Sequence, residues 1–435
     1  MSAPARSSGS IAWQAEEGWA LEQDARDPLA WCRDEFELPR GADGRPLVYL
    51  CGNSLGPMPR AARDLIATEL DDWSRLAVDA HLEGRTPWYT YHERLREPLA
   101  RLVGAEPAEV VAMSSLTVNL HLMLVSFYRP MGARRRILIE EGAFPSDRYA
   151  VTSHLRSRGL DPADSLLVAA PRPGEATLRT EDLEALLAER GARIALVLLP
   201  GVQYFTGQLL DLERITRAAR RAGCAVGFDL AHAVGNTVLR LHDWGADFAV
   251  WCSYKYLNGG PGSAGGAFVH ARHARDASLP RFAGWWGNDP STRFDMHRNP
   301  EFVPVVGADG WQLSNPPILS MAPLRASLDL FDRAGIAALR ARSERLTGYL
   351  EHLVQRSGEG GPEIITPREP AARGCQLSLR LPGRGRAIFD GLRAKGIVGD
   401  LREPDVIRVA PAPLFNTFHE VWRAGQALSE LLPPR

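Results

Sequence analysis

Short apolar segments alternate with amphipathic ones through the middle of the chain, and this alternation constrains the fold most strongly. The segments 181–190 and 212–223 place apolar residues on one face, as helices do, and stop at Gly191 and Gly223. Apolar strands that alternate with helices are typical of a mostly parallel sheet covered on both faces, so the sequence predicts an α/β fold. Six apolar segments have the character of buried strands: 134–140, 165–170, 194–199, 224–228, 247–252 and 264–269.

The pattern changes after about residue 325. A helical region at roughly 324–356 is followed by CQLSLRL (375–381), whose alternation of apolar and polar residues predicts a half-exposed strand. DVIRVAP (405–411) is another strand candidate, and Thr417 with Glu420 fits a capping box that begins a closing helix. We therefore expect three parts, which are a tail and segment that packs with the small domain (1–60), a large domain (61–325) and a small α+β domain (326–435).

Composition excludes several classes of partner. The formal net charge is −1 and the basic residues are spread along the chain, which argues against nucleic acid and against an anionic membrane surface. No apolar run approaches the ~20 residues needed to cross a bilayer, and the first ten residues lack the apolar core of a signal peptide. Five cysteines without a CxxC pair are typical of a reduced, cytoplasmic protein. The histidines form only an isolated HxxH (His270 and His273), so no metal site is expected.

Lysine is rare in this chain. Of its 51 basic residues only Lys255 and Lys395 are lysines, so the other 49 are arginines. An amine, unlike a guanidinium, can lose its proton and attack a carbonyl. Lys255 follows the strand at 247–252 and Asp229 follows the strand at 224–228, so both are expected at the sheet edge where such folds bind ligands. The alternatives are a leftover surface lysine and an aspartate that only caps the next helix.

A lysine and an aspartate at neighbouring strand ends suit pyridoxal phosphate (PLP). The lysine would bind the aldehyde of the cofactor, and the aspartate would keep its ring nitrogen protonated. SSLTVNLHLML (114–124) places Ser and Thr ahead of an apolar helical run, where backbone N–H groups could hold a phosphate, although a plain N-cap is the alternative. The lysine, the aspartate and the start of the helical run together favour a PLP site.

Seven segments are distinctive: GNSLG, SSLTVNLHLML, EGAFPSDRYA, LPGVQYFTGQLLDL, GFDLAHAVGN, WCSYKYLNGGPG and GWQLSNPPIL. Together they resemble kynureninase, a family of fold-type I PLP-dependent enzymes. The likeness runs from about residue 48 to RVAPAPLFNTFHEVW (408–422). It implies a large domain with a mostly parallel sheet, a smaller α+β domain, PLP as cofactor and a homodimer with shared active sites. It also implies hydrolysis of the Cβ–Cγ bond of kynurenine or 3-hydroxykynurenine to an anthranilate and L-alanine.

The resemblance implies roles for individual residues. Lys255 corresponds to the Schiff-base lysine and proton-transfer base, Asp229 to the partner of the ring nitrogen, and Tyr254 to a proton donor near the phosphate. Trp285 of GWWGND and Asn315 of LSNPP correspond to residues that the neighbouring subunit supplies. The remaining cofactor contacts implied are Leu116 and Thr117 at the phosphate, Phe144 stacked on the ring, Asp147 and His232. The substrate contacts implied are Ser54, His81, Asn315 and Arg408, the last as the grip on the α-carboxylate.

Taken singly, these residues have ordinary explanations. Phe144 and Trp285 could be core aromatics, Tyr254 a strand-end tyrosine, His81 a surface histidine and Arg408 one more surface arginine. Their motif context favours the functional interpretation.

Substrate choice and reaction type stay open at this point. The His81, Asn315 and Ser54 set resembles the pocket that favours 3-hydroxykynurenine, but a ring-substituted kynurenine of a specialised pathway fits equally well. Another fold-type I enzyme, an aminotransferase or a cysteine desulfurase, is the nearest rival, and an inactive or regulatory PLP-binding protein is another. A desulfurase needs a mobile catalytic cysteine in a Gly/Ser-rich loop late in the chain, and no cysteine has that context here.

Overall fold

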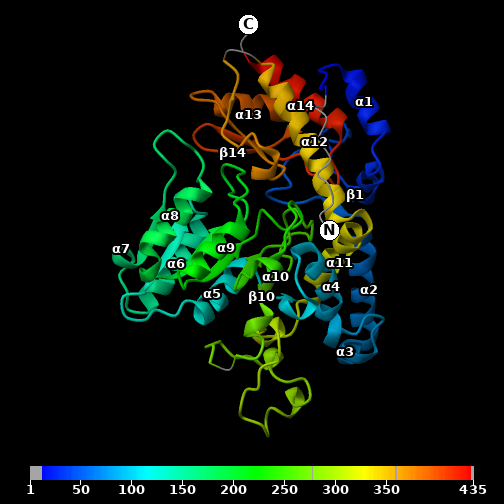
Figure 1. Ribbon diagram of the computed structural model, residues 1–435. Helices are drawn as coiled ribbons and strands as arrows, with labels where there is room; N and C mark the ends of the chain where they lie inside the picture. The colour runs from blue at the N-terminus through cyan, green and yellow to red at the C-terminus, as the bar shows by residue number, and fades with distance from the viewer. Residues whose placement is uncertain (1–11, 277, 358–359, 433–435) are drawn as a thin grey trace, which may run out of the picture.

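A seven-stranded sheet forms the centre of the computed structural model, which describes residues 12–276, 278–357 and 360–432 (Figure 1). The strand order is β4-β10-β9-β8-β7-β5-β6. β5 to β9 pair in parallel, and β10 runs antiparallel to both of its neighbours. All six predicted strands are present, and the mostly parallel sheet is confirmed. The bounds are β4 (Val110–Ala112), β5 (Arg136–Glu140), β6 (Leu166–Ala169), β7 (Ile194–Pro200), β8 (Ala225–Asp229), β9 (Phe248–Trp251) and β10 (Gly266–Val269).

Helices cover both faces of this sheet, as the continuous apolar strands require. In β7, Leu196 and Leu198 belong to one buried cluster, whereas Val197 and Leu199 belong to the other. The first cluster includes apolar residues of α5 (Leu116–Phe127) and α6 (Pro145–Ser157). The second includes those of α4 (Arg96–Val103), α8 (Thr180–Arg190), α9 (Leu212–Arg221) and α11 (Ile318–Ala334). The predicted helices at 181–190 and 212–223 are therefore α8 and α9.

The helical region expected at 324–356 is divided into two helices. α11 ends at Ala334, and α12 spans Ile336–Gln355. Gly335 between them has a positive φ of 75°, a conformation that glycine adopts without steric cost. Before the sheet, α2 (Ala61–Leu76) and the short α3 (Ala80–Glu83) precede α4, and α2 packs along α11. Two short helices, α7 (Pro162–Ser165) and α10 (Leu241–Trp244), lead into β6 and β9.

A second, antiparallel sheet lies toward the C-terminus, in the order β11-β12-β15-β14. Its strands are β11 (Glu363–Ile364), β12 (Leu377–Arg380), β14 (Asp400–Arg402) and β15 (Val406–Val409). α12, α13 (Gly385–Ala394) and α14 (Phe418–Leu431) share its buried cluster, and the predicted capping box at Thr417 and Glu420 is confirmed. The expectation that 375–381 is half-exposed is wrong. Its polar face is also buried, because Ser378 donates to the Phe205 carbonyl at 2.6 Å and so meets a loop of the large sheet.

The N-terminal segment packs against these C-terminal elements. α1 (Glu17–Ala25) lies beside α14, where Asp24 accepts the backbone N–H of Phe418 at 2.7 Å (Figure 1). β2 (Val48–Tyr49) pairs in parallel with β13 (Ile397–Val398), and β1 (Phe36–Glu37) pairs with β3 (Met58–Pro59). The predicted tail at residues 1–10 lies outside the described residues. Within the described ranges, no helix combines the length and apolar character needed to cross a membrane.

Candidate active site

A cavity of about 70 Å³ opens at the carboxyl ends of the parallel strands. Asp229 ends β8, Pro200 ends β7 and Lys255 follows β9 by a few residues. The two residues that the sequence placed at one sheet edge therefore line one cavity, at the position where open α/β sheets bind ligands. The lining residues are Leu116, Thr117, Glu140, Phe144, Asp147, Pro200, Val202, Tyr204, Asp229, Ala231, His232, Tyr254 and Lys255.

Lys255 points toward His232 and an aromatic ring. Its Nζ lies 3.0 Å from His232 Nε2 and 5.7 Å from the centroid of the Phe144 ring. Burial, and secondly the positive charge of Lys255, hold the pKa of His232 well below its usual range. His232 is therefore neutral and can accept a proton or a hydrogen bond from the lysine at Nε2. Its Nδ1 is buried without a hydrogen-bond partner among the described residues.

Three carboxyl groups surround the other end of the cavity. Asp229 Oδ1 accepts the Ala231 N–H at 2.7 Å, so it does stabilise the following turn, as one alternative supposed, while its carboxylate also lines the cavity. Burial, followed by the charge of Asp229, raises the pKa of Asp147 well above its usual value. Burial raises the pKa of Glu140 to about 8, with Asp229 as a further cause. The three groups therefore carry fewer than three charges near neutral pH, an arrangement suited to one cationic partner.

The start of α5 forms a further wall of the cavity. Ser115 precedes the helix in an extended conformation, and its side chain makes no capping hydrogen bond, so the plain N-cap interpretation does not hold for it. The Thr117 hydroxyl lies 3.0 Å from that of Ser146. A Cβ on Gly265 would come within 3.1 Å of the Leu116 nitrogen, so glycine keeps the helix start open. First-turn N–H groups have no partner within their own helix and attract anions.

These residues fit PLP. Lys255 supplies the amine, the α5 N-terminus suits a phosphate, and the carboxyl cluster suits a protonated ring nitrogen. Phe144 is 38% exposed and meets Tyr204 edge-on, with ring centroids 5.2 Å apart, which leaves a ring face for stacking. Two buried polar atoms in the cavity, His232 Nδ1 and Asp147 Oδ1, have no partner among the described residues, as expected where a polar group binds.

Arg408 and Ser54 do not line the cavity themselves, but Arg408 and the loop that carries Ser54 each contact a residue that does. Arg408 in β15 is buried and donates from Nη1 to the Tyr204 carbonyl at 2.7 Å and from Nη2 to Asp400 at 2.5 Å. Its Nε is buried without a partner among the described residues. Ser54 is exposed on the GNSLG loop, whose Gly56 donates to the Tyr254 carbonyl at 2.8 Å. Burial raises the pKa of Tyr254 above its usual value, so its phenol stays protonated.

Three further predicted site residues also lie outside this cavity. His81 and Asn315 line a separate cavity of about 490 Å³, together with Trp73, Trp88 and residues 316–320. His81 Nδ1 lies 3.0 Å from the Val78 carbonyl. Trp285 packs edge-on against Trp286, with ring centroids 4.9 Å apart. The structure therefore does not bring these three residues to Lys255 of the same chain.

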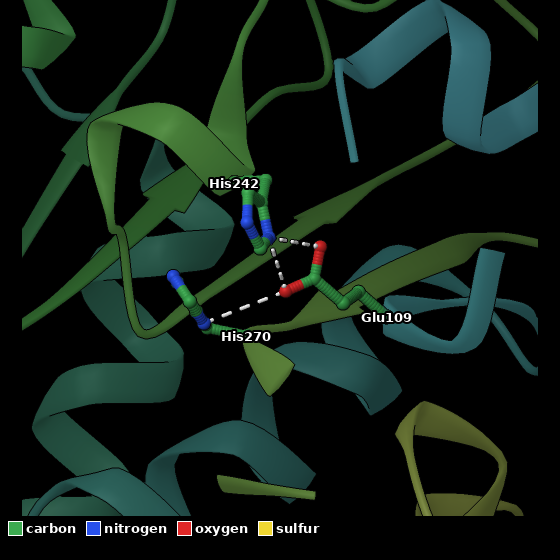
Figure 2. Close-up of side chains that lie close together, drawn as sticks. All are labelled: Glu109, His242 and His270. Carbon is green, nitrogen blue, oxygen red and sulfur yellow. Dashed lines mark hydrogen bonds and ion pairs between the residues drawn. The ribbon is translucent and has the colours of Figure 1, made fainter. Parts of the chain in front are cut away.

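Sequence reasoning missed two residues with polar side chains that line the Lys255 cavity. Glu140 is the last residue of β5, and Tyr204 lies on the loop after β7. Both had an available signal, because they follow predicted parallel strands at the carboxyl edge. The sequence offers only an isolated HxxH, whereas in the folded chain His242 and His270 lie beside Glu109, a group that could hold a metal ion (Figure 2). That group joins residues too distant in sequence for any motif.

The chain is similar to known proteins over most of its length. Residues 48–375 match the family described as Aminotransferase class-V, and residues 339–428 match the Kynureninase C-terminal domain. A kynureninase of Myxococcus xanthus is 57% identical over 96% of this chain and 97% of its own length. A kynureninase of Xanthomonas euvesicatoria is 59% identical over 92% and 95%.

Solved structures share the fold at much lower identity. The cysteine desulfurase CsdA of Escherichia coli is 17% identical, with a TM-score of 0.73 over 93% of this chain and 98% of its own. A C-DES mutant with glycine covalently linked to its PLP cofactor is 18% identical, with a TM-score of 0.75 over 88% and 96%. These likenesses identify the fold-type I PLP-dependent fold.

Proposed function

The chain belongs to the kynureninase family of PLP-dependent hydrolases, and we propose that it cleaves the Cβ–Cγ bond of kynurenine, 3-hydroxykynurenine or both. Water is consumed, and the products are an anthranilate and L-alanine. The observation that carries the proposal is one cavity that combines the Lys255 amine with Asp229, in a chain more than half identical to kynureninases along almost its whole length. Such a reaction belongs to tryptophan catabolism.

The residues around Lys255 divide the work of the reaction. Bound PLP supplies an electron sink, which takes up the electron pair left on a substrate carbon when one of that carbon's bonds breaks. When its amine is not joined to the cofactor, Lys255 is free to move a proton at the substrate Cα. Neutral His232, whose Nε2 lies 3.0 Å from Lys255 Nζ, is its hydrogen-bond partner. Asp229 stabilises positive charge at the far end of the cavity. Tyr254, protonated in its buried position, is the acid–base candidate as water adds to the γ-carbonyl.

Arg408 is proposed to hold the substrate α-carboxylate. Its guanidinium is fixed by Asp400 and by the Tyr204 carbonyl, and Tyr204 itself lines the cavity. The buried Nε without a partner among the described residues is a donor suited to a carboxylate oxygen. A planar guanidinium offers paired donors that a lysine does not, which supports an arginine at this position.

We propose a homodimer in which each chain completes the other's active site. His81, Trp285 and Asn315 lie away from Lys255 of their own chain, so their implied role requires a second copy. His81 and Asn315 line a cavity whose exposed apolar residues include Trp73 and Leu319, which a partner surface would cover. A His81 imidazole and an Asn315 amide facing the substrate ring would favour the 3-hydroxy substrate, because hydrogen bonds to a hydroxyl discriminate strongly.

The desulfurase alternative has little support. All five cysteines lie in the described part of the chain, and each of them is buried and free. None is therefore available as a mobile nucleophile. Their free state is also consistent with a cytoplasmic location, which we propose.

The first experiment compares substrates. Kynurenine and 3-hydroxykynurenine are incubated with the PLP-loaded enzyme, and anthranilates and alanine are quantified. Release of alanine and an anthranilate in equal amounts supports the proposal. Absence of turnover with both substrates, together with ready transamination of alanine, would instead identify an aminotransferase.

The second experiment tests the shared site. Lys255→Ala and Asn315→Ala proteins are each weakly active alone, and they are mixed and allowed to exchange subunits. One intact site then forms in each mixed dimer, so activity returns to about a quarter of the wild-type level. As a matched control, Lys255→Ala mixed with Asp229→Ala regains nothing, because both changes lie in the same chain's cavity. A mixture that stays inactive in both cases would refute the shared site.

A further inference from the structure

Glu109, His242 and His270 meet at the end of the large sheet opposite the Lys255 cavity (Figure 2). Glu109 directly precedes β4, His270 directly follows β10 and His242 lies in α10, which leads into β9. Because β10 runs antiparallel to β9, all three positions fall at the amino ends of the parallel strands. The group therefore lies outside the machinery proposed for hydrolysis.

We propose that these three side chains form a binding site for one transition-metal ion, with Zn²⁺ as the ion that fits best. Two imidazole nitrogens and one carboxylate are a ligand set that Zn²⁺ prefers, with a fourth position left for water. No sequence motif signals it, because the three residues are separated by 133 and 161 positions from Glu109. The proposal rests on the geometry of the three side chains.

The ligand atoms already have nearly the spacing of a metal site. His242 Nδ1 lies 2.9 Å from Glu109 Oε1 and 3.0 Å from Oε2, and His270 Nδ1 lies 3.4 Å from Oε1. Ligands at ~2.0–2.1 Å from a tetrahedral Zn²⁺ are about 3.3 Å apart from one another. All three ligand atoms lie within 4.8 Å of one another, so binding requires the two imidazoles to adjust around the ion, which a half-buried His242 can do.

A metal ion at His270 would replace an existing hydrogen bond. The backbone N–H of Arg272 donates to His270 Nδ1 at 3.2 Å, so this nitrogen is an acceptor and carries no proton. It faces Glu109 Oε1, which is also an acceptor. An imidazole nitrogen has one lone pair, so an ion that bound both atoms would displace the Arg272 N–H and would offset the repulsion between the two acceptors, which lie 3.4 Å apart.

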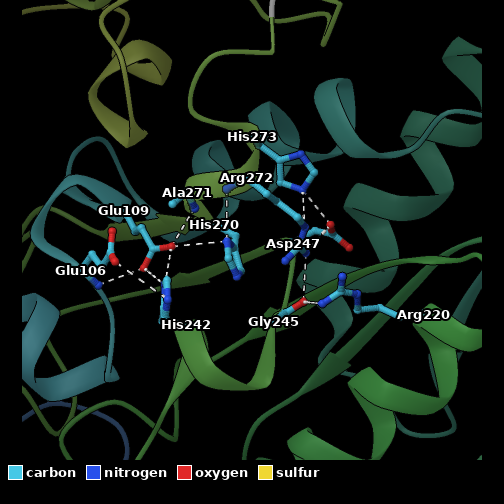
Figure 3. A network of polar contacts seen from close by, with 10 residues as sticks. All are labelled: Glu106, Glu109, Arg220, His242, Gly245, Asp247, His270, Ala271, Arg272 and His273. Carbon is cyan, nitrogen blue, oxygen red and sulfur yellow. Dashed lines mark hydrogen bonds and ion pairs between the residues drawn. The ribbon is translucent and has the colours of Figure 1, made fainter.

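The surroundings hold the ligands in position (Figure 3). The Glu109 side chain is fully buried and accepts the backbone N–H groups of Glu106 at 2.9 Å and of Ala271 at 2.6 Å. The His242 Nε2 faces the Glu106 carboxylate at 3.9 Å, the partner that a metal-bound histidine commonly has. His242 is 37% exposed, which gives an ion and its water a way in.

The expected consequence is structural. A bound ion would join the ends of β4 and β10 to α10, three segments that are far apart in the chain. Binding to the folded state alone stabilises it in proportion to the logarithm of ion concentration over Kd, so Tm should rise by about 3 °C in excess Zn²⁺. Hydrolysis itself should not change at 25 °C.

The test uses PLP-loaded enzyme from which metals have been removed by a chelator. Equilibrium dialysis against Zn²⁺ should give one ion per chain, bound with a micromolar or lower Kd. His242→Ala and His270→Ala should each weaken binding about 100-fold and abolish the Tm shift, while retaining kynurenine hydrolysis. His297→Ala, which removes an exposed histidine outside the group, is the matched control and should bind as wild type.

Two further outcomes decide the proposal. Lys255→Ala, inactive in hydrolysis, should keep the zinc site, so that failure of the proposed function and failure of this site are distinguishable. Retention of stoichiometric binding by both histidine variants, or absence of stoichiometric binding by wild type, would overturn the proposal. His242 is partly exposed, so its replacement should fold even if a change at buried Glu109 does not.

Discussion

Replacement of Arg408 by lysine should weaken substrate binding through a single, calculable loss. The arginine is 1% exposed, and its position is set by hydrogen bonds to Asp400 and to the Tyr204 carbonyl. Lysine keeps the positive charge but presents one ammonium in place of paired donors. We expect the variant to fold, because the charge opposite Asp400 is retained.

The magnitude follows from the number of bonds lost. A substrate carboxylate held by paired donors loses one charge-assisted hydrogen bond, which contributes about 1.5–3 kcal/mol. At about 1.4 kcal/mol per tenfold, kcat/KM for kynurenine should fall roughly 10- to 150-fold. The Kd of L-alanine, read from the spectrum of the bound cofactor, should rise by a similar factor because alanine carries the same carboxylate.

A matched control separates binding from folding. Arg342 is another buried arginine, paired with Asp27 at 2.6 Å. Its hydrogen-bond partners do not line the Lys255 cavity, whereas Tyr204, a partner of Arg408, does. Arg342→Lys should lower Tm and leave the Kd of L-alanine unchanged. If Arg408→Lys binds alanine and turns over kynurenine as the wild type does, the carboxylate lies elsewhere and the reasoning is refuted.

Three other changes test the cavity and the sheet. Lys255→Ala should abolish the absorbance band that the PLP-loaded protein shows near the visible edge, and a retained band would exclude this lysine as the cofactor's attachment point. Burial raises the pKa of Glu140 from 4.5 to about 8 in the folded state. The folded state therefore binds this proton more tightly than the unfolded state, and the stability that results is complete below pH 4.5 and is lost as pH rises to 8. In urea unfolding of the PLP-free protein, Glu140→Gln should remove this loss, on the order of 4 kcal/mol, and equal pH profiles would contradict it. A Cβ at Gly227 would lie 2.0 Å from the Phe248 ring, so Gly227→Ala should lower the free energy of unfolding by about 3 kcal/mol, whereas Gly18→Ala, in open space, should not.

The architecture around the cofactor site was largely determined by local sequence. Continuous apolar segments of strand length, separated by amphipathic helices, can bury their side chains only in a sheet covered on both faces. That topology places the residues after β8 and β9 at one edge, so Asp229 and Lys255 were expected together before any coordinates. The capping box at Thr417 is likewise a local feature, because its hydrogen bonds span three residues.

Other features depended on contacts between distant segments. Alternation in 375–381 indicated a solvent-facing side, but a loop from the large sheet covers Ser378. Motif likeness grouped His81 with Lys255, whereas the folded chain directs it to a separate cavity. Glu109 reaches His242 across 133 positions. Hydrophobic periodicity reports only which face of an element is buried, whereas loop paths and packing decide which distant segment covers that face.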